Sequence, residues 1–146
     1  MIVNVIQSVV ASLTPSAPAF YHAEQFEQNL NDDATFPMVY LEHPIKGKDL
    51  TPNNSPALAH SIEYTLNIFF LDKTNLDDTI LDRQTIIDAM LALKRQFVVR
   101  LCNHSAVKTL GVVEHTEVYN VLDLNLDGVW TTLTVTLYDK DAVCLT

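Results

Sequence analysis

The side chains best suited to chemistry lie near the end of the chain, where oxygen-bearing residues alternate with leucines. They are Asp123, Asn125 and Asp127, and Gly128 follows directly. This spacing is typical of the first half of an EF-hand calcium loop, in which positions 1, 3 and 5 supply oxygen ligands and position 6 is glycine. The loop also needs a glutamate at position 12, where this chain has Thr134. We therefore interpret Asn125 to Gly128 as a tight turn before a strand, and Asp123, Asn125 and Asp127 remain weak candidates for metal ligands.

The other residues that could carry chemistry show no arrangement typical of an enzyme. The histidines lack an HExxH pattern or a consistent metal spacing; they are His22, His43, His60, His104 and His115. Three glycines are too few for a phosphate-binding loop or a dinucleotide fingerprint. We predict no enzyme, no catalytic residue and no cofactor. The enzymatic alternative is a hydrolase in which Asp123, Asp127 and His115 converge on a metal ion.

The composition indicates one domain with a sizeable core and an acidic surface. The chain has 146 residues, 48% of them hydrophobic, and its 18 acidic and 9 basic residues give a formal net charge of -9. This charge opposes binding to nucleic-acid phosphates and to anionic membranes. Lys94, Arg95 and Arg100 form a basic cluster, which we interpret as the solvated end of a helix. Cys102 and Cys144 are expected to be reduced, partly buried thiols, which indicates folding inside the cell.

The N-terminal segment is expected to belong to the fold. It is too short and too polar for a transmembrane helix, and no lysine or arginine precedes Lys46, so the cationic start of a signal peptide is missing. Apolar residues between Ile2 and Leu13 repeat at helical spacing, and Pro15 follows where a helix could stop. The sequence therefore predicts an N-terminal helix.

Long strands are predicted around one long helix in the rest of the chain. A one-sided strand is expected at residues 58–70, because its apolar side chains alternate with polar ones. A helix is expected from Asp77 to Leu101, because acidic residues suit its start and basic residues suit its end. Further strands are expected at residues 36–42, 107–121 and 128–138.

These elements predict an α+β fold. One mainly antiparallel sheet with two helices packed on one face would bury every apolar stripe, and its other face would meet solvent or a partner. Residues 44–56 are rich in Pro, Lys, Asn and Ser and have no core pattern, so a loop or an arm is expected there. The prediction is a single domain over residues 1–146, with the loop or arm at about 44–57.

The predicted element order and three short sequences resemble a family of phage proteins. The short sequences are Phe69-Phe70-Leu71-Asp72, Glu117-Val118-Tyr119-Asn120 and Asp127-Gly128-Val129-Trp130. Together with the order of helix, strands, long helix and two strands, they resemble the tail-terminator and tail-completion proteins of tailed bacteriophages. The resemblance covers nearly the whole chain.

This resemblance implies a structural role in the virion, at the tail or neck, after assembly in the host cytoplasm. Proteins of the family form rings, commonly hexameric, that cap the finished tail tube and join it to the head-side connector. The ring leaves a channel for DNA, and the acidic surplus of this chain would let DNA pass without binding. The implied partners are further copies of the chain, the tail tube protein and head-side connector proteins, with no membrane.

Two groups of residues are candidates for contacts between subunits. A ring needs sheet edges or arms that can pair across subunits. The candidates are Lys46, Lys48, Asp49 and Leu50 in the predicted arm, and Thr132, Thr134 and Thr136 on the face of the last strand opposite its core residues. Two alternatives remain open: a small intracellular binding or adaptor domain without enzymatic activity, and another neck or connector ring protein.

Overall fold

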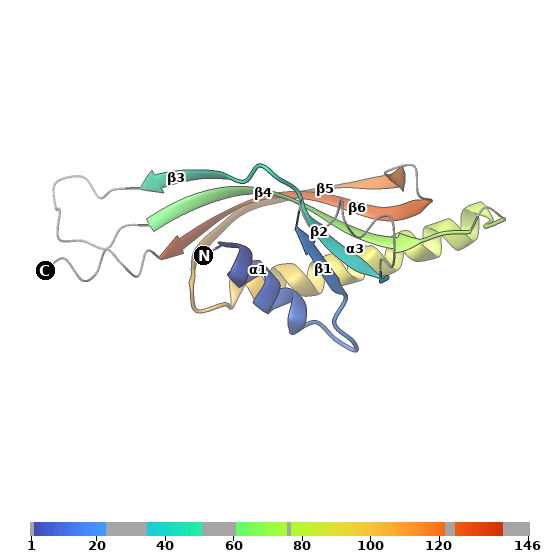
Figure 1. Ribbon diagram of the computed structural model, residues 1–146, viewed down its shortest axis with the longest axis horizontal. Coiled ribbons are helices and arrows are strands. Elements are labelled where there is room, and N and C mark those ends of the chain that lie inside the picture. Colours follow the sequence, from blue (N-terminus) through green and yellow to red (C-terminus); the bar gives the residue numbers. More distant parts are fainter. Residues whose placement is uncertain (1, 23–34, 51–60, 76, 122–124, 139–146) are drawn as a thin grey trace, which may run out of the picture.

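The computed structural model describes residues 2–22, 35–50, 61–75, 77–121 and 125–138, which form one sheet with helices on one side (Figure 1). The elements in chain order are α1 (Ile2–Ala11), β1 (Ala19–His22), β2 (Met38–Leu41), β3 (Lys46–Leu50), β4 (Ser61–Lys73), α3 (Ile80–Cys102), β5 (Val107–Val121) and β6 (Leu126–Tyr138). The predicted α+β class, with a mainly antiparallel sheet and both helices on one face, is confirmed. Within these residues no helix has both the length and the apolar character needed to cross a membrane.

The sheet is built around two long neighbouring strands, β4 and β6. They pair in antiparallel register from Ser61 opposite Tyr138 to Lys73 opposite Leu126. β5 lies beside β6, while β3 flanks the first half of β4 and β2 flanks its second half. β1 pairs with β2 in parallel. In the described part of the chain, β1 and β3 therefore lie along one edge of the sheet and β5 forms the other.

The helix-covered face of the sheet forms the main core. Leu66, Ile68 and Phe70 of β4 have almost no exposed surface, and their β6 partners Leu133 and Val129 are buried with them. Because successive strand residues point to opposite faces, this alternation confirms the predicted one-sided strand. The first residues of that prediction, 58–60, lie outside the described ranges.

Both helices bury the apolar stripes that the sequence predicts. The buried residues of α1 are Ile2, Val5, Ile6, Val9 and Val10. In α3 the ring of Phe97 meets the ring of Phe70 edge to face, with centroids 5.4 Å apart. Contacts of this kind join the helices and the sheet into one hydrophobic core.

A capping box fixes the start of α3. The Thr79 hydroxyl accepts a hydrogen bond from the backbone N–H of Asp82, and the Asp82 carboxylate accepts one from the N–H of Thr79. The N–H and the hydroxyl of Thr79 both donate to the Asp82 carboxylate, and these two hydrogen bonds lower the pKa of Asp82. The helix therefore begins slightly later than predicted, and Asp78 lies before it, where its carboxylate accepts a hydrogen bond from the N–H of Asn75.

The prediction of a loop or arm at residues 44–56 is wrong for its first half. Residues 46–50 form β3, which pairs with β4 from Lys46 opposite Thr65 to Leu50 opposite Ser61. β3 lacks an apolar alternation because its side chains are exposed on both faces, apart from half-buried Leu50. Residues 51–57 lie outside the described ranges.

The predicted turn before the last strand is also displaced. Asn125 lies in the turn, with a φ of 52°, but Leu126, Asp127 and Gly128 already belong to β6. Gly128 is needed for a different reason than a turn: a Cβ atom there would overlap the carbonyl oxygen of Phe70 in β4. Glycine therefore allows the two central strands to approach closely.

A second, smaller hydrophobic cluster involves the sheet face that the helices leave open. It consists of the buried residues Tyr21, Met38, Leu71 and Leu126. Leu71 follows the core residue Phe70, so its side chain points to the opposite face of the sheet. One end of the helix-free face is therefore buried, whereas the rest is partly exposed.

Candidate functional site

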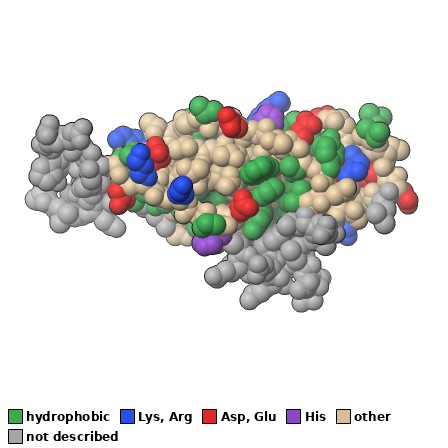
Figure 2. Space-filling model, turned by 90° about the horizontal axis from the view of Figure 1, so that it is seen from above, with side chains coloured by type: hydrophobic (Ala, Val, Ile, Leu, Met, Phe, Trp, Pro, Cys, Tyr) green, Lys and Arg blue, Asp and Glu red, His purple; other side chains and the backbone are tan. Residues whose placement is uncertain are grey.

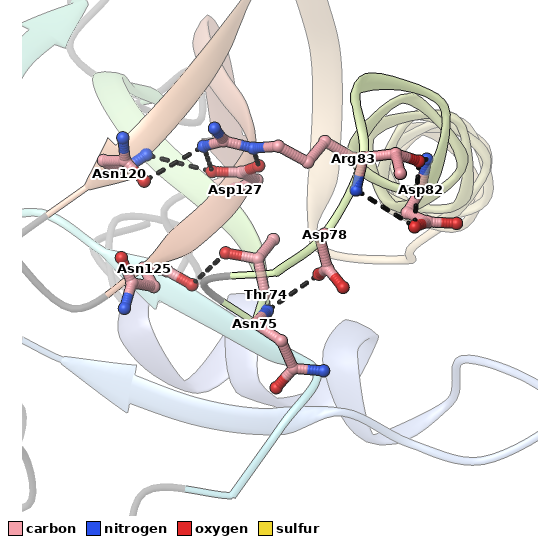
Figure 3. Close-up of polar contacts among 9 residues, drawn as sticks. Thr74, Asn75, Asp78, Asp82, Arg83, Asn120, Asn125 and Asp127 are labelled. Atoms are coloured by element: carbon pink, nitrogen blue, oxygen red, sulfur yellow. Dashed lines mark hydrogen bonds and ion pairs between the residues drawn. The ribbon is translucent and has the colours of Figure 1, made fainter.

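Two of the metal-ligand candidates, Asn125 and Asp127, lie at the end of the β5–β6 hairpin, where they make structural contacts. The Asp127 carboxylate is completely buried and accepts hydrogen bonds from Arg83 of α3, with Nε 2.7 Å from Oδ2 and Nη2 2.9 Å from Oδ1 (Figure 3). The backbone N–H of Asn120 donates to the same Oδ1 at 2.9 Å. Both carboxylate oxygens are thus occupied by protein donors. We call this arrangement of Arg83, Asn120 and Asp127 the hairpin clip.

The two ionisable side chains of the hairpin clip, Asp127 and Arg83, stabilise each other's charged forms. Burial of the Asp127 carboxyl disfavours ionisation, but the hydrogen bonds from Arg83 and the Asn120 N–H outweigh it, so the pKa of Asp127 is lowered. The hydrogen bonds to Asp127 in turn raise the pKa of Arg83. Arg83 also donates to the Asn120 side-chain oxygen at 3.0 Å and lies over the Tyr119 ring, 5.2 Å from its centroid. The clip therefore binds the start of α3 to the hairpin.

Asn125 contributes its backbone instead of its side chain. Its carbonyl oxygen accepts hydrogen bonds from the N–H and the hydroxyl of Thr74, at 2.8 and 2.7 Å. These bonds fix the turn to the end of β4 (Figure 3). Asp123, the third metal candidate, lies outside the described residues.

The residues of the hydrolase alternative are directed to different partners. Asp127 is bound to Arg83, whereas His115 Nδ1 lies 3.3 Å from Nζ of Lys94. Where the chain is described, no group of three or more histidine, cysteine, aspartate or glutamate side chains is arranged to hold a metal ion. The geometry thus gives the hairpin clip a role in fixing α3 to the sheet.

The expected basic cluster at the end of α3 is not uniformly solvated. Lys94 is buried, with 8% of its surface exposed, while Arg95 and Arg100 are exposed. Burial lowers the pKa of Lys94, and the nearby charge of Arg95 adds to the effect. Cys102 also differs from expectation because it is exposed; Cys144 lies outside the described residues.

The threonines predicted as contact residues do lie on the helix-free face, but they are not equally accessible. Thr132 and Thr134 are half-buried, and the Thr132 hydroxyl donates to the side-chain oxygen of Asn67 at 3.0 Å. Thr136 is buried in the single chain, because it lies between Glu63 of β4 and Thr109 of β5. The expectation that Thr136 meets water or a partner is therefore wrong for the isolated chain.

A row of aromatic side chains, which sequence reasoning missed, crosses the helix-free face. Tyr40, Phe69 and Trp130 occupy neighbouring positions on β2, β4 and β6. The Phe69 ring lies 5.9 Å from the rings of both Tyr40 and Trp130, at interplanar angles of 27° and 8°. Figure 2 shows hydrophobic side chains across the middle of this face. The sequence did contain a signal for this row. Phe69 and Trp130 are each adjacent in sequence to a core residue, so in a strand their side chains must point to the opposite face of the sheet.

The remaining contact candidates lie on β3. Lys46, Lys48 and Asp49 are exposed and Leu50 is half-buried. Lys46 and Lys48 lie opposite Thr65 and Glu63 of β4, which places them on the helix-free side. Figure 2 shows charged side chains at the end of the molecule where Figure 1 places β3.

Comparison of the sequence with protein-family models and with curated proteins finds no match.

Proposed function

We propose that this protein is a structural virion subunit of the tail-terminator or tail-completion type. In this role it forms a ring, most simply a hexamer, that caps the tail tube and joins it to the head-side connector. The proposal rests on the resemblance in element order and short sequences described above. DNA would pass through the channel without specific binding.

The observation that carries the proposal is the shape of the sheet. The helices cover one face, and a short exposed strand and a long exposed strand, β3 and β5, border opposite sides of the described sheet. A subunit with two different edges can contact its neighbours head to tail, and repeated contacts of this kind form a ring when the rotation between neighbours closes. The formal net charge of -9 further supports a channel that DNA does not adhere to.

The polar residues of the hairpin agree with an assembly role. The hydrogen bonds of the hairpin clip hold α3 and the β5–β6 hairpin together. A rigid subunit lowers the entropic cost of association, because fewer groups must be ordered when the ring forms.

The direct test is the size and shape of the assembled protein. Size-exclusion chromatography with light scattering should give a discrete oligomer, and negative-stain images should show rings with a central opening. When mixed with purified tail tubes, the rings should bind at one tube end. A protein that stays monomeric at every concentration, and leaves both tube ends free, would contradict the proposal.

The aromatic row favours the adaptor domain as a second candidate function. Trp130 has 38% of its surface exposed and stacks on Phe69, and aromatic side chains are enriched at surfaces that bind a protein partner. A stable monomer that loses a cytoplasmic binding partner when Trp130 is replaced would support this candidate over the ring protein.

A further inference from the structure

The two edge strands of the sheet differ in charge. β3 carries exposed Lys46, Lys48 and Asp49, a net charge of +1, while β5 carries exposed Lys108, Glu114 and Glu117, a net charge of -1. In the described part of the chain β3 pairs with β4 alone, and β5 pairs with β6 alone. The outer side of each strand therefore presents backbone groups that can pair with a further strand.

The regular part of β5 is slightly longer than the five-residue β3. Its pairing with β6 is continuous from Val113 opposite Leu133 to Val118 opposite Gly128, and register shifts interrupt it on either side. This segment, residues 113–118, contains both glutamates. Because bulges disturb pairing, it is the part of β5 best suited to accept a strand of five residues such as β3.

We infer that Lys46 to Asp49 of β3 in one copy pair in antiparallel register with residues 113–116, in the regular segment of β5, of the next copy. The inference rests on the proposed ring and names the surfaces that form it. Successive strands β3, β4, β6 and β5 alternate in direction, so a neighbouring copy in the same orientation presents β3 antiparallel to β5. The sheet would then continue from one subunit into the next.

Charge selects the register of this contact. Lys46 and Lys48 face the helix-free side, as does Glu114, which lies opposite Thr132. When Lys48 is placed opposite Glu114 of the neighbour, Lys46 becomes its diagonal neighbour, within reach of its long side chain. Asp49 then lies opposite Val113, so it does not face a glutamate directly.

The same charges disfavour the symmetric alternatives. Two β3 strands side by side would bring lysines together, and two β5 strands would bring glutamates together, both of which are repulsive. Lysines on an edge strand generally discourage unwanted pairing. Here they would repel a second β3 and attract the acidic β5, so the contact is head to tail and a ring can close.

The decisive experiment exchanges the charges. On the helix-free side, where these residues lie, both edges are acidic in K46E/K48E and both are basic in E114K. Each variant should therefore lose rings, with association weaker by on the order of tenfold or more. The triple variant K46E/K48E/E114K should regain rings. An equimolar mixture of the two deficient variants should also form rings, because acidic and basic edges then alternate around an even number of subunits.

The measurement is light scattering coupled to chromatography, with circular dichroism to verify that each variant folds. Lys73→Glu at the exposed end of β4 is the matched control, because it changes the charge equally per residue but lies away from β3 and residues 113–118. It should leave the rings intact.

The outcomes separate the two proposals. If the unaltered protein forms rings that survive K46E/K48E and E114K equally well, the edge contact is overturned while the ring function stands. If both variants fail and neither the triple variant nor the mixture recovers, the charge pairing is also overturned. If the unaltered protein forms no ring and caps no tube, both proposals fail.

Discussion

The two faces of the sheet use aromatic side chains differently. On the helix-covered face Phe70 and Phe97 meet edge to face and are fully buried. On the helix-free face Phe69 and Trp130 stack with their rings nearly parallel, and Trp130 stays partly exposed. The same residue type therefore serves the stability of the single chain on one face and forms an accessible surface on the other.

Polar residues differ between the faces in the same way. Asp127 and Lys94 are buried on the helix-covered side. Asp127 stays ionised there because Arg83 donates hydrogen bonds to it, whereas burial lowers the pKa of Lys94. Thr132 and Asn67, on the helix-free side, bind each other while half-exposed. Substitutions on the first face should thus change folding strongly, and substitutions on the second should change it weakly. The following predictions test that contrast.

Phe97→Ala should have the largest effect on the free energy of unfolding. Removing a fully buried ring leaves a cavity and should cost about 3–5 kcal/mol, whereas Phe69→Ala on the opposite face should cost about 1–2 kcal/mol. Urea denaturation followed by circular dichroism measures both. Because total stability is about 5–15 kcal/mol, the milder Phe97→Leu provides a value if the alanine variant is unfolded. Equal losses for Phe97→Ala and Phe69→Ala would contradict the contrast.

Asp127→Asn should come next, because it removes the charge that the buried clip needs. The expected loss is about 2–3 kcal/mol, since the hydrogen bonds from Arg83 to a buried position weaken and the half-buried Arg83 guanidinium loses its charged partner. Asp72→Asn, directly opposite on β4 and half-exposed, is the control and should change stability little. If Asp127→Asn lost no more stability than the control Asp72→Asn, the contact with Arg83 would add no stability.

The clip also predicts acid sensitivity. The pKa of Asp127 is lower in the folded chain than the unfolded value of about 3.9, so folding is favoured above that value. This contribution is lost as the pH falls through the lowered folded pKa. Unfolding measured between neutral pH and pH 2 should therefore show an acid-dependent loss that is smaller in Asp127→Asn. Identical pH profiles would count against the charged clip.

Lys94→Met should stabilise the chain, by about 1 kcal/mol at neutral pH, because a buried ammonium group is replaced by an apolar side chain of similar length. The pKa of Lys94 is lowered in the folded state, so its cost is present at neutral pH and disappears as the pH rises toward the unfolded value of about 10.4. The advantage of the methionine variant should shrink accordingly. Arg95→Met, at an exposed position, should show no such gain.

Trp130→Thr should have the smallest effect on folding, about 0.5–1 kcal/mol, because it removes a partly exposed stacked ring from a strand and inserts a good strand former. Thermal unfolding provides the measurement. A loss as large as that of Phe97→Ala would show that the aromatic row belongs to the core.

The sequence predicted the fold well where its signals were local. Helical spacing in α1 and alternation in β4 depend on neighbouring residues, and both predictions are confirmed. β3 was missed because its sequence, Lys46 to Leu50, is exposed on both faces, so no apolar alternation marks it as a strand. Its pairing with β4 is a tertiary contact that local patterns do not report.

The candidate site was less predictable. The sequence drew attention to Asp127 as a calcium ligand, but its partner Arg83 lies 44 residues away in the chain. Lys94 was interpreted as a solvated lysine, although it is buried and lies beside His115 of β5. In both cases, the missing information was which distant element would pack against the charged group.

By itself, the sequence determined which residues alternate, which repeat at helical spacing and where acidic residues favour a helix start, because these properties arise between neighbours along the chain. Only the tertiary structure decided that Asp127 forms an ion pair with Arg83 and that Gly128 lies against the backbone of β4. It also decided that β3 and β5 lie at opposite edges of the sheet with net charges of opposite sign. Such properties depend on the folding of distant segments onto one another. The residues from Asn125 to Gly128, part of a candidate calcium loop in the sequence, thus form the end of a hairpin, where Asp127 holds α3 to the sheet.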